Sequence, residues 1–241
     1  MEFDIIDYVL TAIAVVIFPI WGVLDYRRFQ RKAAEGAPNA RVNQYRLTIA
    51  FEWFVVGIIL VAWLAKGRGL ASLGLGLQVG TWFWLGVGLT LAAVGGVIGQ
   101  AVLATRSPEK LRELREQFAD LEPLIPRDRR EVWWWRALSV TAGICEEVIY
   151  RGFLIAVLAA AMSTWAAVLL AAFIFGLNHA YQGPKGILKT GLFGLVVGGL
   201  FVLTGSLWAP MLMHVVMDLA AGYVGRRAIL LPTGGSPALA A

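Results

Sequence analysis

The sequence predicts an all-α membrane protein: a polytopic transmembrane helical bundle of about seven spans, or eight if one segment breaks in two, with an amphipathic connector helix. Composition and segment length support this prediction. Of the 241 residues, 59% are hydrophobic and only 15% are charged, whereas soluble domains average about 45–50% and about 25%. The mean hydropathy is +0.70. The apolar residues also gather into segments near the length of about 20 residues that a helix needs to cross a bilayer.

The charge and the cysteine content exclude several other classes of protein. The formal net charge of +5 comes mainly from basic residues between the apolar segments, where the positive-inside rule expects them. We therefore expect the lipid bilayer as a partner and no nucleic acid. The lone cysteine, Cys145, excludes a disulfide within the chain. The acidic start, Met1–Asp4, lacks the basic region of a signal peptide, so the first apolar segment is expected to remain as a helix.

Three apolar segments precede the first long charged connector. They run over Ile5–Leu24, Leu47–Ala65 and Thr81–Ala104, and the second contains one carboxylate, Glu52. Each is long enough to cross the membrane as a helix. We expect these segments and the connector to form an N-terminal membrane scaffold, residues 1–136.

The connector, Arg106–Arg136, is expected to contain a helix of its own. Ser107 followed by Pro108 is typical of a helix N-cap and first position. Apolar residues then recur at helical spacing, with charged residues on the other faces: Leu111, Leu114, Phe118 and Leu121. Such a helix either lies flat on the membrane surface or packs on the protein's own cytoplasmic end. The run Trp133–Trp135 is typical of an aromatic belt at the headgroups.

Four further apolar segments follow. They run over Ala137–Ala161, Trp165–Ala180, Ile187–Leu203 and Leu207–Val224. We expect residues 137–225 to form the core that contains the functional residues, and residues 226–241 to form a cytoplasmic tail.

The basic residues predict how the spans are oriented. With the N-terminus outside and the C-terminus in the cytoplasm, alternation of seven spans places nearly all basic connections on the cytoplasmic side, as the positive-inside rule requires. These connections are Arg27–Arg46, Arg106–Arg136, Lys185 and Arg226–Arg227. The short Lys66–Arg68 link is the exception.

Six ionisable side chains interrupt the last four apolar segments. They are Glu146, Glu147, Arg151, His179, His214 and Asp218. An Asp, Lys or Arg at mid-helix costs about 2.5–3.5 kcal/mol on insertion scales. One or two such residues could simply hold helices together. Six in one half of the chain predict a functional site.

Their spacing predicts which of them meet. Glu147 and Arg151 are four residues apart with the acid first, the favourable order for a helical ion pair. Glu146 then points about 100° away around the helix, without a local counter-ion and free to act as a general base. His214 and Asp218 share a helical face, so the carboxylate can fix one ring nitrogen and leave the other free.

A free carboxylate and two imidazoles support two related chemistries. Glu146, His179 and His214 could hold a metal ion, such as zinc, that activates a bound water molecule. Alternatively, Glu146 takes a proton from water while the imidazoles stabilise an oxyanion. Cys145 is interpreted as a packing residue, because adjacent acids and aliphatic neighbours disfavour a thiolate.

The three blocks together resemble the CAAX-processing and bacteriocin-processing membrane proteases, the CPBP or Abi family. The family pattern is Glu-Glu-x-x-x-Arg, then Phe-x-x-x-His, then His-x-x-x-Asn or Asp. Here it falls at Glu146–Arg151, Phe175–His179 and His214–Asp218. The resemblance covers roughly Ala137–Tyr223.

The resemblance implies an intramembrane endopeptidase that acts on membrane-associated, lipidated or CAAX-like peptides or proteins, as a glutamate protease or a metalloprotease. It implies that Glu146 activates water, that Glu147 and Arg151 shape the site, that the two histidines bind an oxyanion or a metal, and that Asp218 orients His214. Aspartate at position 218 is the form often seen in bacterial relatives, which predicts a bacterial inner-membrane protein.

Two other classes compete with this hypothesis. A non-catalytic immunity or assembly factor could use the same fold to bind a peptide, but it would not need a poised base. A proton-coupled transporter also uses glutamates and histidines, but transporters often carry broken helices in both halves. Here the polar residues lie nearly all in one half.

Overall fold

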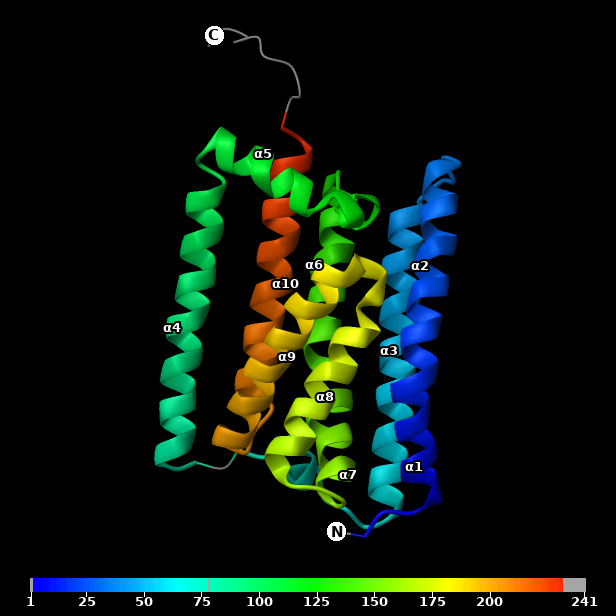
Figure 1. Ribbon diagram of the computed structural model, residues 1–241, viewed down its shortest axis with the longest axis vertical. Coiled ribbons are helices and arrows are strands. Elements are labelled where there is room, and N and C mark those ends of the chain that lie inside the picture. Colours follow the sequence, from blue (N-terminus) through cyan, green and yellow to red (C-terminus); the bar gives the residue numbers. More distant parts are fainter. Residues whose placement is uncertain (1, 78, 232–241) are drawn as a thin grey trace, which may run out of the picture.

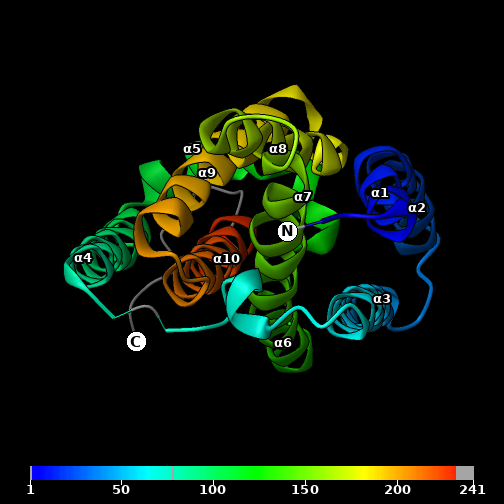
Figure 2. The ribbon, with the colours of Figure 1, turned by 90° about the horizontal axis from the view of Figure 1, so that it is seen from below.

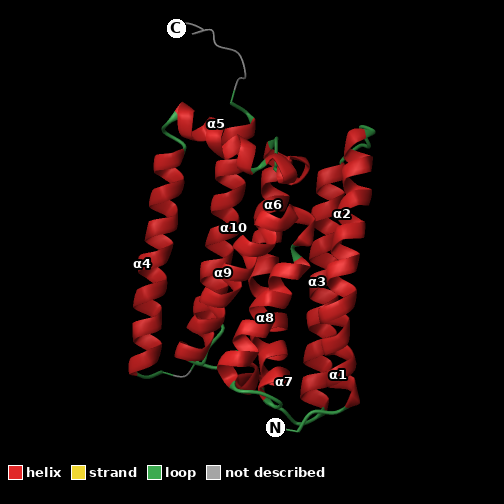
Figure 3. Ribbon diagram, viewed as in Figure 1, coloured by secondary structure: helices red, strands yellow, loops and turns green. Residues whose placement is uncertain are grey.

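The chain folds into helices that stand side by side, and no strand occurs among the residues described by the computed structural model, 2–77 and 79–231 (Figures 1 and 3). The long helices are α2 (Phe18–Ala34), α3 (Ala40–Ala65), α4 (Thr81–Ala104), α6 (Arg129–Glu146), α8 (Thr164–Asn178), α9 (Gly183–Thr204) and α10 (Trp208–Ile229). The shorter elements are α1 (Ile5–Ala12), η1 (Ile13–Ile17), η2 (Leu70–Leu73), α5 (Pro108–Gln117), η3 (Ala119–Leu124), η4 (Glu147–Leu154), α7 (Ile155–Ala159) and η5 (Ala180–Gln182). An all-α fold is therefore confirmed.

Within the described part of the chain, four helices are long and apolar enough to cross a membrane. They are Ile5–Ala34, Ala40–Ala65, Thr81–Ala104 and Ala180–Thr204. Large apolar side chains point away from the bundle on these helices, as on α3, where Val61 is 71% exposed and Phe54 is 65% exposed. Such surfaces are stable in lipid and costly in water.

The other predicted segments are helices in the same bundle. α6, η4 and α7 follow one another without a gap from Arg129 to Ala159, so the fourth predicted segment does not break in two. α8 is apolar but has 15 residues. α10 continues through Arg226 and Arg227 to Ile229, while 232–241 of the predicted tail lie outside the described residues.

The connector helix packs on the end of the bundle. Ser107 accepts a hydrogen bond from the backbone N–H of Lys110 at 3.1 Å, which confirms the predicted cap. Leu111 is buried, and Phe118 and Ile125 pack closely against Gly225 of α10. Figure 1 shows α5 lying across the top of α10. Of the two predicted positions for this helix, packing on the protein itself is the one observed.

The two ends of the bundle differ in charge. The last turns of α2 and α10 carry Arg31, Lys32, Arg226 and Arg227, and these turns lie at the same end of the bundle as α5, opposite the N-terminus (Figure 1). The predicted segregation of basic residues to one end is therefore confirmed for these elements.

The Lys66–Arg68 exception to the charge pattern is neutralised locally. Lys66 pairs with Asp4 and Asp7, and Arg68 pairs with Asp7 at 2.9 Å. Asp4 also caps α1. The hydrogen bond from Lys66 holds the pKa of Asp4 below its usual value. This acidic partner explains why a basic link can lie at the opposite end from the other basic residues.

Candidate active site

The six predicted site residues come from three neighbouring parts of the bundle. Glu146 ends α6, and Glu147 and Arg151 lie in the π-helical stretch η4. His179 directly follows α8, and α10 carries both His214 and Asp218. Seen from below in Figure 2, α6 lies between α3 and α10, and α8 lies beside α7. A π-helical stretch at this point is typical of functional sites in helices.

A glycine lets α6 and α10 approach closely beside the site. A Cβ placed on Gly143 would lie 2.5 Å from Cγ2 and 2.9 Å from the backbone N of Val215. Real Cβ atoms do not approach other atoms so closely, so only glycine fits. Because Gly143 is three residues before Glu146 and Val215 follows His214, this contact brings the glutamate and the histidine together.

Glu147 is the centre of the buried charge network. Its Oε1 accepts hydrogen bonds from Arg151 Nη1 at 2.9 Å and from His214 Nδ1 at 2.7 Å. Glu147 has no exposed surface and Arg151 is 2% exposed. The guanidinium also donates to the Gly194 carbonyl at 3.3 Å and lies 4.3 Å from the centre of the Phe175 ring. The predicted Glu147–Arg151 pair is confirmed, and it is tied to α8, α9 and α10.

The carboxylate that fixes His214 is not the predicted one. Asp218 Oδ2 lies 3.9 Å from His214 Nε2, beyond hydrogen-bond distance, whereas Glu147 binds Nδ1. An i,i+4 spacing puts two residues on one face but does not exclude a stronger partner on another helix. Here Glu147 reaches across from η4, because α6 and α10 pack closely.

Glu146 faces the opposite nitrogen of the same imidazole. Its Oε2 lies 3.7 Å from His214 Nε2 and has no hydrogen-bond partner among the described residues. The Glu146 side chain is 18% exposed and that of Asp218 is 36% exposed. The prediction that Glu146 remains free of Arg151 is confirmed, and the glutamate reaches both the histidine and open space.

His179 lies close to this group, held by its own helix. Its Nδ1 lies 2.8 Å from the Phe175 carbonyl, which can only accept, so Nδ1 donates. In the neutral ring Nε2 then has a free lone pair. The ring packs between Phe175 and Tyr181, with centroids 4.6 and 5.8 Å away. The histidine can therefore accept a hydrogen bond through Nε2 from a fixed position.

The donors do not form a ready metal site. Across residues 2–77 and 79–231, no three His, Cys, Asp or Glu side chains gather closely enough to hold a metal ion. The closest approach to the free nitrogen of His214 is that of Glu146, at 3.7 Å. Cys145 has no exposed surface and packs in the core, in keeping with its interpretation as a packing residue.

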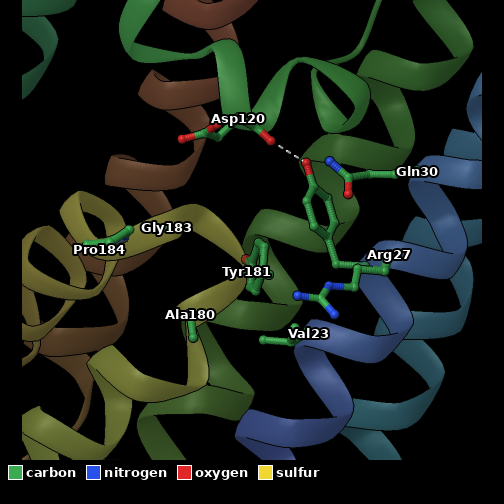
Figure 4. A pocket seen from close by; sticks show the side chains of 9 residues that line it. Val23, Arg27, Gln30, Asp120, Ala180, Tyr181, Gly183 and Pro184 are labelled. Atoms are coloured by element: carbon green, nitrogen blue, oxygen red, sulfur yellow. Dashed lines mark hydrogen bonds between the residues drawn. The ribbon is translucent and has the colours of Figure 1, made fainter.

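A cavity of about 340 Å³ opens next to His179 on the basic side of the bundle. It lies between α2, η3, η5 and the start of α9, and Figure 4 shows Arg27, Gln30 and Tyr181 around it. The Tyr26 hydroxyl, which also lines it, donates to the Asp120 carbonyl. Tyr181, which lines the cavity, also packs on the His179 ring, so the cavity lies next to this histidine.

Two residues near the site did not stand out in the sequence. The Trp135 indole N–H donates to the Asp218 carbonyl at 3.1 Å, and its ring packs on Gly222. It therefore lies in the α6–α10 interface, whereas Trp133 is 60% exposed, as a belt residue would be. Glu52 is buried on α3, and its charge interacts with those of Glu146 and Asp218. A lone carboxylate in an apolar segment was the only available signal for it.

Residues 128–220 match the family described as Type II CAAX prenyl endopeptidase Rce1-like. The matched range begins at the N-cap of α6 and ends within α10, so it contains all six predicted site residues. No curated protein and no solved structure matches the chain.

Proposed function

Because residues 128–220 match the Type II CAAX prenyl endopeptidase Rce1-like family, we propose that the chain is an intramembrane endopeptidase of this family that hydrolyses membrane-associated peptides. The observation that carries this proposal is the placement of His214 between two glutamates. Glu147 binds Nδ1 at 2.7 Å, and Glu146 lies 3.7 Å from Nε2. One glutamate positions the imidazole, and the other is free to accept a proton.

In the proposed mechanism, Glu146 takes a proton from a water molecule that attacks the scissile carbonyl. His214, held by Glu147 as an imidazolium, donates from Nε2 to the oxyanion that forms. His179 accepts a hydrogen bond from the attacking water through its free Nε2. Collapse of the tetrahedral intermediate breaks the C–N bond, and Glu146 delivers its proton to the leaving amine.

The substrate enters from the basic end of the bundle in this proposal. The seven helical segments cross the bilayer, and the end that carries Arg31, Lys32, Arg226 and Arg227 faces the cytoplasm, as the positive-inside rule expects. The cavity beside Tyr181 opens near that end. A peptide tethered to the cytoplasmic leaflet by an acyl or prenyl chain would reach His179 and Glu146 through it.

Cleavage of quenched peptides by purified protein in detergent micelles tests the proposal. The panel contains farnesylated CAAX-like peptides and unmodified hydrophobic peptides. We compare wild type with Glu146→Gln, His214→Ala and a matched control, Glu122→Gln, in which an exposed glutamate becomes an amide. Loss of a general base typically costs 10²–10⁴-fold, so we expect at least a 100-fold loss for Glu146→Gln and wild-type rates for the control.

Two outcomes of this experiment would contradict parts of the proposal, and a third measurement distinguishes its two possible mechanisms. Wild-type rates in a folded Glu146→Gln variant would overturn the role of Glu146. Absence of cleavage by wild type across the panel would favour a non-catalytic immunity or assembly factor. A zinc chelator is added in parallel, because activity that survives it supports glutamate-activated water and activity that is lost supports a metal-bound water.

A further inference from the structure

A third carboxylate, Glu52, lies on the inner face of α3. The buried positions of this helix recur three, four or seven residues apart, as in a packed helical seam: Val42, Tyr45, Glu52, Val56, Ile59 and Trp63. Glu52 is therefore the one acidic residue on a buried stripe of aliphatic and aromatic side chains. Only 8% of the residue is exposed. An ionisable residue within a membrane helix that faces the bundle interior indicates a functional role.

Glu52 has an unsatisfied oxygen. Its Oε2 is buried and has no hydrogen-bond partner among the described residues, and the same holds for Glu146 Oε2. Buried polar atoms in proteins are almost always hydrogen-bonded, to protein or to water. The titratable groups near enough for their charges to act on Glu52 or to be acted on by it are Glu146 and Cys145 from α6, Tyr150 from η4 and Asp218 from α10. These groups include no cation that could pair with it.

The register between α3 and the α6–η4 helix shows how far apart the two glutamates are along the axis of the bundle. Four contacts define it: Arg41–Glu131, Tyr45–Trp135, Trp53–Thr141 and Trp63–Phe153. In each, the second residue lies 88–90 positions after the first. Glu52 is therefore level with residues 140–142, four to six residues before Glu146. Four to six residues of helix correspond to a rise of about 6–9 Å.

This spacing is too long for one bridging water molecule, because two O–H···O hydrogen bonds of about 2.7 Å each span at most about 5.4 Å, and it suits two bridging water molecules. We infer that Glu52 is a water-positioning residue of the hydrolytic site, which binds a second water molecule that in turn donates a hydrogen bond to the attacking water held by Glu146. The inference rests on the proposed function, and it adds a residue from outside the family-matched range.

Kinetics of two Glu52 variants test the inference. Glu52→Gln keeps the shape but replaces one acceptor oxygen with a donor, so kcat should fall at least 10-fold with KM within 2-fold of wild type. Glu52→Asp keeps both acceptors and should recover part of kcat. The matched control is Asp25→Asn, the same change on α2, where Gln44 donates to the side chain at 2.6 Å. A folded Glu52→Gln variant with wild-type kcat would overturn the inference.

A second measurement does not depend on proteolysis. A water-soluble methanethiosulfonate reagent should modify Glu52→Cys at least 10-fold faster than Ile59→Cys, which lies two turns further along the same buried stripe. The native Cys145 has no exposed surface, so the reagent should not modify wild type, which serves as the blank. Equal rates at the two positions would overturn the inference, because water would not reach Glu52. If wild type cleaves no peptide, the proposed function fails, and this labelling alone decides whether Glu52 faces a hydrated site.

Discussion

Neutralising Glu147 should destabilise the protein strongly, because the change leaves a buried cation without its partner. Glu147 has no exposed surface, and Arg151 is 2% exposed. In Glu147→Gln, the guanidinium keeps its hydrogen bond to the Gly194 carbonyl and its contact with the Phe175 ring. The carboxylate charge that pairs with Arg151 at 2.9 Å, and that also holds His214 at 2.7 Å, is lost.

The expected cost follows from this burial. Removing one partner of a buried ion pair typically costs 3–5 kcal/mol. Since Arg151 retains two other contacts, we expect about 3 kcal/mol for Glu147→Gln, the lower end of that range. Removing both charges together, in Glu147→Gln/Arg151→Met, should recover most of this loss, because a buried pair replaced by neutral groups of similar volume is often close to neutral in stability.

Unfolding by SDS in mixed micelles, followed by tryptophan fluorescence, measures these free energies. The matched control is Glu113→Gln, which breaks the exposed helical pair between Glu113 and Lys110, 2.8 Å long. Exposed pairs contribute about 0–1 kcal/mol. If Glu147→Gln costs no more than Glu113→Gln, or if the double variant is no more stable than the single one, the buried-pair reasoning is wrong.

Three further perturbations address other parts of the molecule. Gly143→Ala should lower kcat about 100-fold, because its methyl would lie 2.9 Å from the backbone N of Val215 and push the two site helices apart; an unchanged kcat would show that the helices adjust freely. Trp135→Phe should cost about 1 kcal/mol in SDS unfolding, since it removes a hydrogen bond of 3.1 Å to α10, and no change would argue against that contact. Asp4→Asn keeps the cap but removes the charge paired with Lys66. In wild type this pairing lowers the pKa of Asp4 below 3.8. The ion pair therefore stabilises the fold fully above pH 3.8, and this stabilisation is lost as the pH falls below that value. The difference in thermal midpoint between wild type and Asp4→Asn should therefore shrink below about pH 4, and a difference that stays constant with pH would contradict the assignment.

The features that the sequence predicted correctly are local ones. Apolar segments of about 20 residues predicted helices, and basic residues between them predicted a charged end. The Glu147–Arg151 pair was predictable because both residues lie on one helix, where i,i+4 side chains meet whatever the rest of the fold does. The cap at Ser107 was predictable for the same reason.

The partners that lie on different helices were not predictable in this way. Spacing within α10 pointed to Asp218 as the partner of His214, yet Glu147, 67 residues away in the chain, makes the hydrogen bond. The connector could lie on the membrane or on the protein, and contact with Gly225 decided between them. The sequence did not distinguish Trp135 from its exposed neighbour Trp133, although Trp135 faces α10.

The sequence by itself determined the helices, their charged end and the six ionisable residues of the family pattern, because these depend on composition and on spacing along one helix. Tertiary structure alone decided that Glu147 binds His214 and that Glu52 lies within two helical turns of the site along the bundle. The physical reason is that helix register and close approach depend on small contacts between distant residues, such as that of Gly143 with Val215, which no periodicity within a single helix encodes.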